Sequence, residues 1–215
     1  MPYTLRLLTD TLPANAKPVL LPAANRVLYV VKGAALVEAG GSVARLAADG
    51  SGFSSQSIAL GAGGEGAEVL RWELVGDPEP NDGKLGDGTS KRTLAAPVTL
   101  DPKAQYLMRL DFIQAGKAPL HYHQGPGIRC LLDGVFTVQT QGHTNTFKPG
   151  EAWFETGPDH VLAWSGEDKP AKFIRVMILP RALEGKMSTR YVDADPQVAT
   201  AGRRWVIYFD RAIEP

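Results

Sequence analysis

The chain has 215 residues, enough for one large domain or two small ones, and its hydrophobic content of 44% is typical of a globular protein with its own core. Lys and Arg total 23, as do Asp and Glu, so the clustered basic charge that nucleic acid or an anionic membrane surface would require is not expected. The single cysteine, Cys130, excludes an internal disulfide. The N-terminus lacks a secretory signal, and no apolar run approaches the roughly 18 residues of a membrane helix. We therefore expect a cytoplasmic protein.

Short segments rich in β-branched and aromatic residues recur along the chain, separated by Gly, Pro, Asp and Asn. Apolar residues do not keep a helical spacing over any long stretch, so the pattern predicts an all-β fold. In chain order, the predicted strands cover residues 26–31, 34–38, 68–75, 106–113, 120–123, 128–132, 135–140, 152–155, 161–164, 173–179 and 204–209.

A segment near the middle of the chain, residues 77–93, is rich in Gly, Pro, Asp and Asn and has few apolar residues. This composition is typical of a linker or a mobile surface loop. It would separate an N-terminal domain, residues 1–76, from a C-terminal domain, residues 94–215.

The two halves of the chain resemble each other, which indicates an internal duplication. Segment 26–33 parallels segment 127–134, and segment 69–74 parallels segment 173–178. With these segments aligned, the first half offers no good metal ligand opposite the histidines of the second half, so it would be a barrel without a metal. The residues that lie there are Leu20, Pro22 and Ser57.

The region from residue 121 to residue 160 carries two histidine motifs, the first His121-Tyr-His123 and the second ending at His160 after a Pro-Gly turn. Together they resemble the two conserved motifs of the cupin superfamily. The resemblance implies two double-stranded β-helix (jelly-roll) barrels in tandem, a bicupin, with a degenerate barrel over residues 1–76 and a metal-binding barrel over residues 94–215. The matching residues are Gly116, His121, His123, Gly134, Pro149, Gly150 and His160.

The resemblance also implies a divalent metal ion, Fe, Zn, Ni or Mn, held by His121, His123 and His160. Residues two apart on a strand point to the same face, so the first two histidines can share one ion, and the third would reach it from another strand. Cupins usually carry a glutamate ligand seven positions before Gly134, where this chain has Gly127. Three histidines would then remain as ligands, and the identity of the metal stays open.

Another side chain could replace the missing carboxylate. Gln124 is adjacent to the first histidine motif and is the better substitute. Glu151 and Glu155 lie in the second motif, but they are expected to face outward, because Ala152 and Phe154 form the apolar face of the same strand.

The resemblance places a substrate pocket beside the metal. Leu162 and Trp164 alternate with His160 and would form an apolar and aromatic wall. Arg109 interrupts an apolar strand and needs a partner, either a bound carboxylate or an internal acid, of which the internal ion pair is favoured. With Gln124, these residues complete the predicted pocket.

The leading functional hypothesis is a metal-dependent cupin enzyme that acts on a small organic acid or a diketone, similar to the three-histidine cupin dioxygenases. One alternative is a non-catalytic cupin that binds or senses a small molecule, and another is a metal-dependent hydrolase or isomerase. The sequence does not choose among them, because the cupin fold hosts many activities. The β-prone segment 204–209 favours a homodimer, since it could pair across a subunit boundary.

Overall fold

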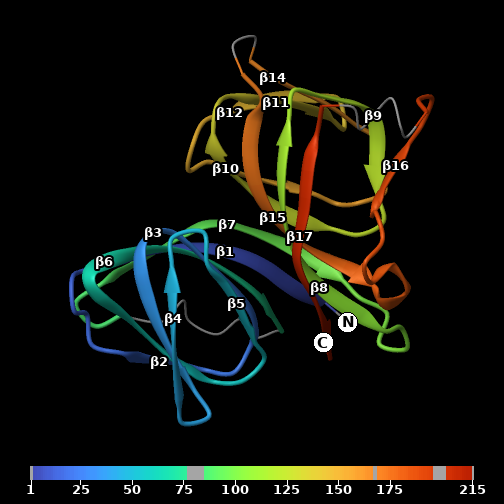
Figure 1. Ribbon diagram of the computed structural model, residues 1–215. Helices are drawn as coiled ribbons and strands as arrows, with labels where there is room; N and C mark the ends of the chain where they lie inside the picture. Colours follow the sequence, from blue (N-terminus) through green and yellow to red (C-terminus); the bar gives the residue numbers. More distant parts are fainter. Residues whose placement is uncertain (1, 77–84, 167–168, 196–201, 215) are drawn as a thin grey trace. The chain divides into compact units, whose positions relative to one another are not determined.

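The computed structural model describes residues 2–76, 85–166, 169–195 and 202–214, which form strands β1 to β17 and one short 3-10 turn (Figure 1). The chain divides into two compact units, Met1–Pro102 and Lys103–Glu214. The fold is therefore all-β, as predicted, and each predicted strand lies within an observed strand to within a residue. Each unit is described by itself.

The first unit is one strongly bent sheet whose strands follow the order β4-β3-β6-β1-β7, with β2 added to β6 and β5 added to β3. The two long strands β3 and β6 bend at register shifts, so the sheet curves around a core of Leu, Val, Ile and Ala side chains. The strands are β1 (Pro2–Leu12), β2 (Val19–Leu21), β3 (Asn25–Ala39), β4 (Ser42–Ala47), β5 (Ser51–Ser54), β6 (Ile58–Val75) and β7 (Thr89–Thr99).

The boundary between the units differs from the predicted linker. Residues 77–84 lie outside the described part of the chain, but residues 89–93 belong to β7, which pairs antiparallel with β1. The first unit consequently continues to Pro102, beyond the expected start of the second domain at residue 94. The polar composition of this segment hid the strand, because β7 lies at the edge of the sheet and most of its side chains are not buried.

The second unit consists of two five-stranded sheets, β13-β10-β15-β8-β17 and β12-β11-β14-β9-β16. Side chains from both sheets meet in one core, in which Trp153 packs against Phe136, Phe147 and Phe173. The elements are β8 (Tyr106–Ala115), β9 (Lys117–His123), β10 (Gly127–Asp133), β11 (Phe136–Thr140), β12 (His143–Phe147), β13 (Ala152–Glu155), β14 (Val161–Ser165), β15 (Ala171–Pro180), η1 (Arg181–Leu183), β16 (Thr189–Tyr191) and β17 (Arg204–Ile213).

The segments that parallel each other in sequence are paired in the same way in the two units. In the first unit Leu28 on β3 lies opposite Arg71 on β6, and in the second Arg129 on β10 lies opposite Arg175 on β15. After β10, as at the equivalent place in β3, the chain passes through a glycine with positive φ, Gly134. The internal similarity therefore extends to the strand register.

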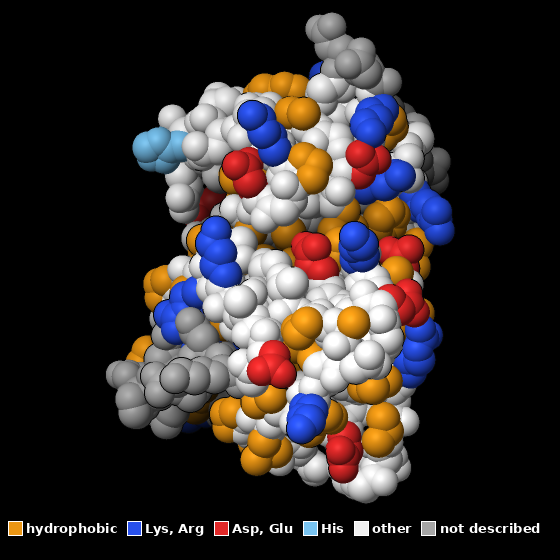
Figure 2. Space-filling model, turned by 90° about the vertical axis from the view of Figure 1, so that its left-hand side faces the viewer, with side chains coloured by type: hydrophobic (Ala, Val, Ile, Leu, Met, Phe, Trp, Pro, Cys, Tyr) orange, Lys and Arg blue, Asp and Glu red, His pale blue; other side chains and the backbone are white. Residues whose placement is uncertain are grey.

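One face of the molecule carries charges of both signs (Figure 2). On the face drawn in Figure 2, Lys and Arg side chains are interspersed with Asp and Glu. Within the described ranges, no helix reaches the length and apolarity that crossing a membrane would demand.

Candidate functional site

Two of the predicted ligands, His121 and His123, lie together on β9 in the second unit. Their side chains are 4% and 3% exposed, and the ring centroids are 5.0 Å apart with an interplanar angle of 81°. His121 Nδ1 lies 2.7 Å from the carbonyl oxygen of Pro119, which can only accept, so Nδ1 carries the proton and Nε2 keeps a lone pair. His123 Nδ1 lies 3.3 Å from Thr189 Oγ1 on β16. The alternation of β9 thus brings both rings inward, as predicted.

Gly127 explains why a glutamate is missing from β10. A Cβ atom at this position would lie 2.5 Å from the carbonyl oxygen of Val176 and 2.9 Å from Met177 Cγ on the neighbouring strand β15. These distances are shorter than van der Waals contact, so no side chain fits here. The close approach of β10 and β15 therefore leaves no room for the usual ligand at this position.

A carboxylate is nevertheless present, because Glu155 on β13 lies directly opposite Gly127 in the strand register. Its Oε2 lies 2.7 Å from Arg129 Nη2 and 3.3 Å from His123 Nε2, and its Oε1 accepts a hydrogen bond of 2.8 Å from Trp153 Nε1. The expectation that Glu155 faces outward is therefore wrong. Trp153 and Glu155 form the inner face of β13, because the large indole, rather than the small Ala152, fills the aromatic core.

The charges of this group follow from burial and from its partners. Burial lowers the pKa of His121 and lowers that of His123 well below its ordinary value, so both imidazoles are neutral at pH 7. Burial would raise the pKa of Glu155, but Arg129 and His123 hold it well below its usual range. Burial, only partly offset by Glu155, lowers the pKa of Arg129 to about 10, which still leaves this side chain charged at pH 7.

His160 does not join the other histidines, which corrects the three-histidine arrangement. Its side chain is exposed and its ring lies 6.0 Å from that of Tyr122, which points away from the barrel interior. The inward positions of the following strand β14 are Val161 and Ala163. His160 precedes this strand on the outer side, so alternation places it outside.

The predicted pocket residues also lie elsewhere. Leu162 and Trp164 share the outward side of β14 with His160, and Trp164 is 37% exposed. Arg109 is fully buried, but it makes a bidentate ion pair with Asp210, with nitrogen–oxygen distances of 2.6 and 2.8 Å. It lines neither of the cavities described next.

Gln124 does not replace the missing ligand. Its backbone N–H donates to the carbonyl oxygen of Ser188, while its buried side-chain nitrogen finds no hydrogen-bond partner within the described ranges. It is absent from the lining of both cavities. Glu155, rather than Gln124, supplies the polar group beside His123.

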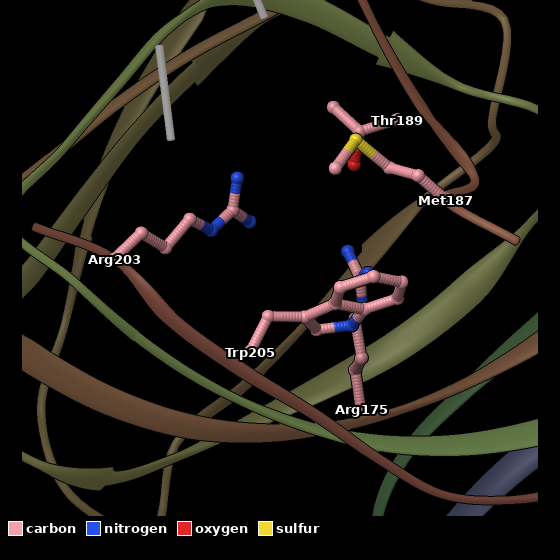
Figure 3. A pocket seen from close by; sticks show the side chains of 5 residues that line it. All are labelled: Arg175, Met187, Thr189, Arg203 and Trp205. Carbon is pink, nitrogen blue, oxygen red and sulfur yellow. The ribbon is translucent and has the colours of Figure 1, made fainter. Parts of the chain in front are cut away.

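The barrel of the second unit contains two adjoining spaces. A chamber of about 20 Å³, room for about one water molecule, is lined by His121, His123 and Glu155 among others. A wider cavity of about 290 Å³ is lined by Met187, Thr189 and Trp205 together with two arginines (Figure 3). Those arginines belong to the lining of both spaces and so connect them: Arg175 and Arg203.

The candidate site residue that sequence reasoning missed is Arg203. Figure 3 shows its guanidinium directed into the wider cavity. Its Nη1 donates to the hydroxyl of Tyr191 at 2.9 Å, whereas its Nε has no hydrogen-bond partner in the described structure. Burial, followed by the nearby charge of Arg175, lowers the pKa of Arg203. Arg203 alternates with Trp205 and Ile207 on the half-buried side of the chain, and this pattern could have indicated that its side chain faces inward.

The residues present do not fit the divalent metal ion that the motif resemblance implies. In the described part of the chain, no three His, Cys, Asp or Glu side chains are arranged to hold a metal. The carboxylate oxygen that faces His123 is already paired with a guanidinium. Three guanidiniums and one carboxylate line the chamber, and a second carboxylate pairs with one of the guanidiniums, which leaves one positive charge and favours an anion over a cation. These side chains are Arg129, Arg175, Arg203, Asp111 and Glu155.

Comparison with known proteins identifies the fold. Neither a family model nor a curated protein matches the sequence. Among solved structures, a variant of oxalate decarboxylase from Bacillus subtilis has a TM-score of 0.60 at 11% identity, over 91% of this chain and 75% of that one. Salicylate 1,2-dioxygenase from Pseudaminobacter salicylatoxidans gives 0.56 at 11% identity, over 95% and 75%, and AerE from Microcystis aeruginosa gives 0.58 at 12%, over 82% and 88%. These neighbours have the cupin fold, so this chain has an all-β barrel of the cupin (jelly-roll) type, which confirms the predicted fold class.

Proposed function

We propose that the second unit binds a small organic carboxylate, held by Arg203 and Arg175 at the entrance to the histidine chamber. The observation that carries this proposal is the guanidinium of Arg203, which is directed into a cavity of about 290 Å³ and has no carboxylate partner within the described residues. A buried charge of this kind is costly unless an opposite charge reaches it. A carboxylate of the ligand would supply that charge.

The neighbouring groups support an anionic ligand. Arg175 pairs with Asp111 through contacts of 2.5 and 2.9 Å, and Trp205 Nε1 donates to the same carboxylate at 2.8 Å, so Arg175 is held in a fixed orientation. Trp205 and Met187 give the cavity an apolar wall against which the body of a ligand can pack. The arrangement suits a carboxylate with a small organic skeleton.

The structural neighbours are consistent with this ligand class. Two of them, oxalate decarboxylase and salicylate 1,2-dioxygenase, are named for small organic acids. Their similarity shows only the fold, so the ligand class is proposed here from the cationic cavity.

A metal-dependent enzyme is the second candidate. The observation that favours it is that neutral His121 and His123 lie with the ionised Glu155 around one chamber, with His123 Nε2 and Glu155 Oε2 3.3 Å apart. The oxalate decarboxylase of Bacillus subtilis is described as having Mn(II) centres. In this chain an ion would have to displace Arg129 from Glu155, which is why anion binding is proposed first.

We also infer that the two units form a bicupin that arose by internal duplication. The equal strand registers support this, and so does the recurrence of a buried arginine–aspartate pair. Arg71 Nε lies 2.6 Å from Asp10 in the first unit, and Arg175 Nε lies 2.5 Å from Asp111 in the second.

Calorimetric titration with oxalate and salicylate tests the proposal. Arg203→Gln should weaken the better ligand at least about tenfold, because it removes a charge-assisted hydrogen bond from a buried site. Arg204→Gln is the matched control: it removes the same charge from the next residue, whose side chain is exposed over Phe112, and should change the affinity less than about twofold.

The same titration separates the two candidates. Equal affinities in the two arginine variants would contradict the proposed site. Binding that disappears after treatment with EDTA, returns with Mn²⁺ and is insensitive to Arg203→Gln would favour the metal-dependent enzyme. Binding that is unaffected by EDTA and lost in Arg203→Gln supports the anion site.

A further inference from the structure

The first unit contains a cavity that neither the motif resemblance nor the proposed function uses. It has a volume of about 310 Å³, within the usual range of small-molecule sites, and it lies among β3, β4, β5 and β6. Most of its wall is aliphatic or aromatic. The side chains that form this wall are Leu28, Val37, Val43, Leu46, Phe53 and Ile58.

One charged group, Arg26, interrupts this apolar lining. Its side chain is 1% exposed, and two of its three nitrogens have partners: Nε lies 2.6 Å from Glu73 Oε1 and Nη2 donates to the carbonyl oxygen of Pro22 at 2.8 Å. The third nitrogen, Nη1, is buried and has no hydrogen-bond partner in the described part of the chain. An unsatisfied buried donor on a charged group is costly, so an acceptor on a ligand that reached this nitrogen from the cavity would offset that cost.

The surrounding contacts fix the position of the free nitrogen. Arg26 shares the carboxylate of Glu73 with Arg6 and Arg71, through contacts of 2.6 and 2.8 Å. Burial lowers the pKa of Arg26, Glu73 raises it, and the two other arginines lower it further. An additional anion beside the guanidinium would therefore stabilise its charged form.

We infer that the first unit is a second ligand-binding site, specific for an apolar monocarboxylate whose carboxylate accepts from Arg26 and whose hydrocarbon part packs against Leu28, Val37 and Phe53. One unsatisfied donor in an apolar cavity favours a ligand with one negative charge on an otherwise hydrophobic molecule, such as a medium-chain fatty acid or an aromatic acid. The second unit, with two arginines at its cavity, selects smaller and more polar acids. This inference stands independently of the proposed function.

Gly52 gives a way to close the cavity without changing the arginine. It lies on β5 in the lining, and a Cβ atom there would contact only Leu46 Cδ1, at 3.4 Å. The side chain of Gly52→Leu would therefore occupy the cavity. Gly63→Leu is the matched control, because a Cβ atom at Gly63 would meet nothing closer than 3.9 Å and this residue does not line the cavity.

The test is calorimetric titration of the full chain with octanoate and octanamide, in the Arg203→Gln background so that anion binding in the second unit is weakened. Octanoate should bind, Gly52→Leu should weaken it at least about tenfold and Gly63→Leu less than about twofold. Octanamide, which has the same chain without the charge, should bind at least about tenfold more weakly.

Absence of octanoate binding, or equal binding in the two glycine variants, would overturn the site, and equal affinity for octanamide would overturn the role of the carboxylate. If Gly52→Leu fails to fold, amide chemical shifts of the Arg203→Gln protein replace it. Octanoate should then shift amides of β3 and β5, and shifts confined to other strands would overturn the inference. The anion proposal for the second unit survives any of these results, because its own test uses different variants and ligands.

Discussion

The substitution Gly127→Ala tests why the second barrel lacks the usual glutamate. The added Cβ atom would lie 2.5 Å from the carbonyl oxygen of Val176 and 3.1 Å from Met177 Cα. Both are backbone atoms of β15, which pairs with β10 over most of its length. Relief of this contact therefore requires one strand to move against the other and strains the hydrogen bonds between them.

Overpacking of a well-packed interior typically costs about 1–3 kcal/mol, and the contact at Gly127 involves backbone that a rotamer change cannot move. We expect Gly127→Ala to lower the free energy of unfolding of the second unit by at least about 2 kcal/mol, and Gly127→Glu by more. Gly116→Ala is the control at another motif glycine. Its Cβ atom would meet Ser165 Oγ at 3.8 Å, an ordinary contact, so its effect should stay within about 0.5 kcal/mol.

Urea unfolding followed by tryptophan fluorescence measures this difference, because three of the four tryptophans lie in the second unit: Trp153, Trp164 and Trp205. A lower midpoint with an unchanged slope is the expected result for Gly127→Ala. If it were as stable as Gly116→Ala, the strands would tolerate a side chain at residue 127, and close approach of β10 and β15 would not explain the missing glutamate.

Arg129→Met removes the guanidinium from Glu155, so Mn²⁺ affinity measured by electron paramagnetic resonance should rise at least about tenfold; an unchanged affinity would show that Arg129 does not oppose the metal. His160→Ala should leave carboxylate affinity within about twofold of the wild type, as should His143→Ala, because both side chains are exposed; a selective loss in His160→Ala would place that ring in the site. Burial would raise the pKa of Glu73, but the neighbouring arginines lower it from 4.5 to about 2, so its stabilising contribution is complete above about pH 4.5 and is lost as the pH falls towards 2. This shift corresponds to about 3 kcal/mol at most. The free energy of unfolding, measured with urea at pH 5 and pH 2.5, should depend less on pH in Glu73→Gln than in the wild type. An equal dependence would assign the acid sensitivity to other groups.

The sequence predicted those features that depend on one strand alone. His121 and His123 are two residues apart on β9, and alternation placed both rings on the inner face. The same alternation linked Leu162 and Trp164 to His160, and these three residues do share a side. That side is the outer one, because the direction in which β14 faces is set by packing of Val161 and Ala163 against the other sheet.

Features that depend on contacts between strands were not predictable in this way. Glu155 acts beside His123 because β13 pairs with β10 at Gly127, a register that the chain order does not reveal. Arg203 reaches the cavity from the segment before β17, far along the chain from the histidine motifs. Arg109 was expected to have an internal acid as partner, and its ion pair with Asp210 confirms this, since a charge on a buried strand needs compensation wherever it lies.

The position of Glu155 opposite Gly127 has a consequence for how acids are exchanged during the evolution of such barrels. Two residues that face each other across adjacent strands can deliver a carboxylate to nearly the same point, so an acid gained on one strand frees the other to lose its own. A glycine at the vacated position then leaves the space that the backbone of Val176 occupies here. Related chains should accordingly carry an acid at one of these two positions and seldom at both. A sequence motif that covers only one of the two strands would record this exchange as the loss of the acid.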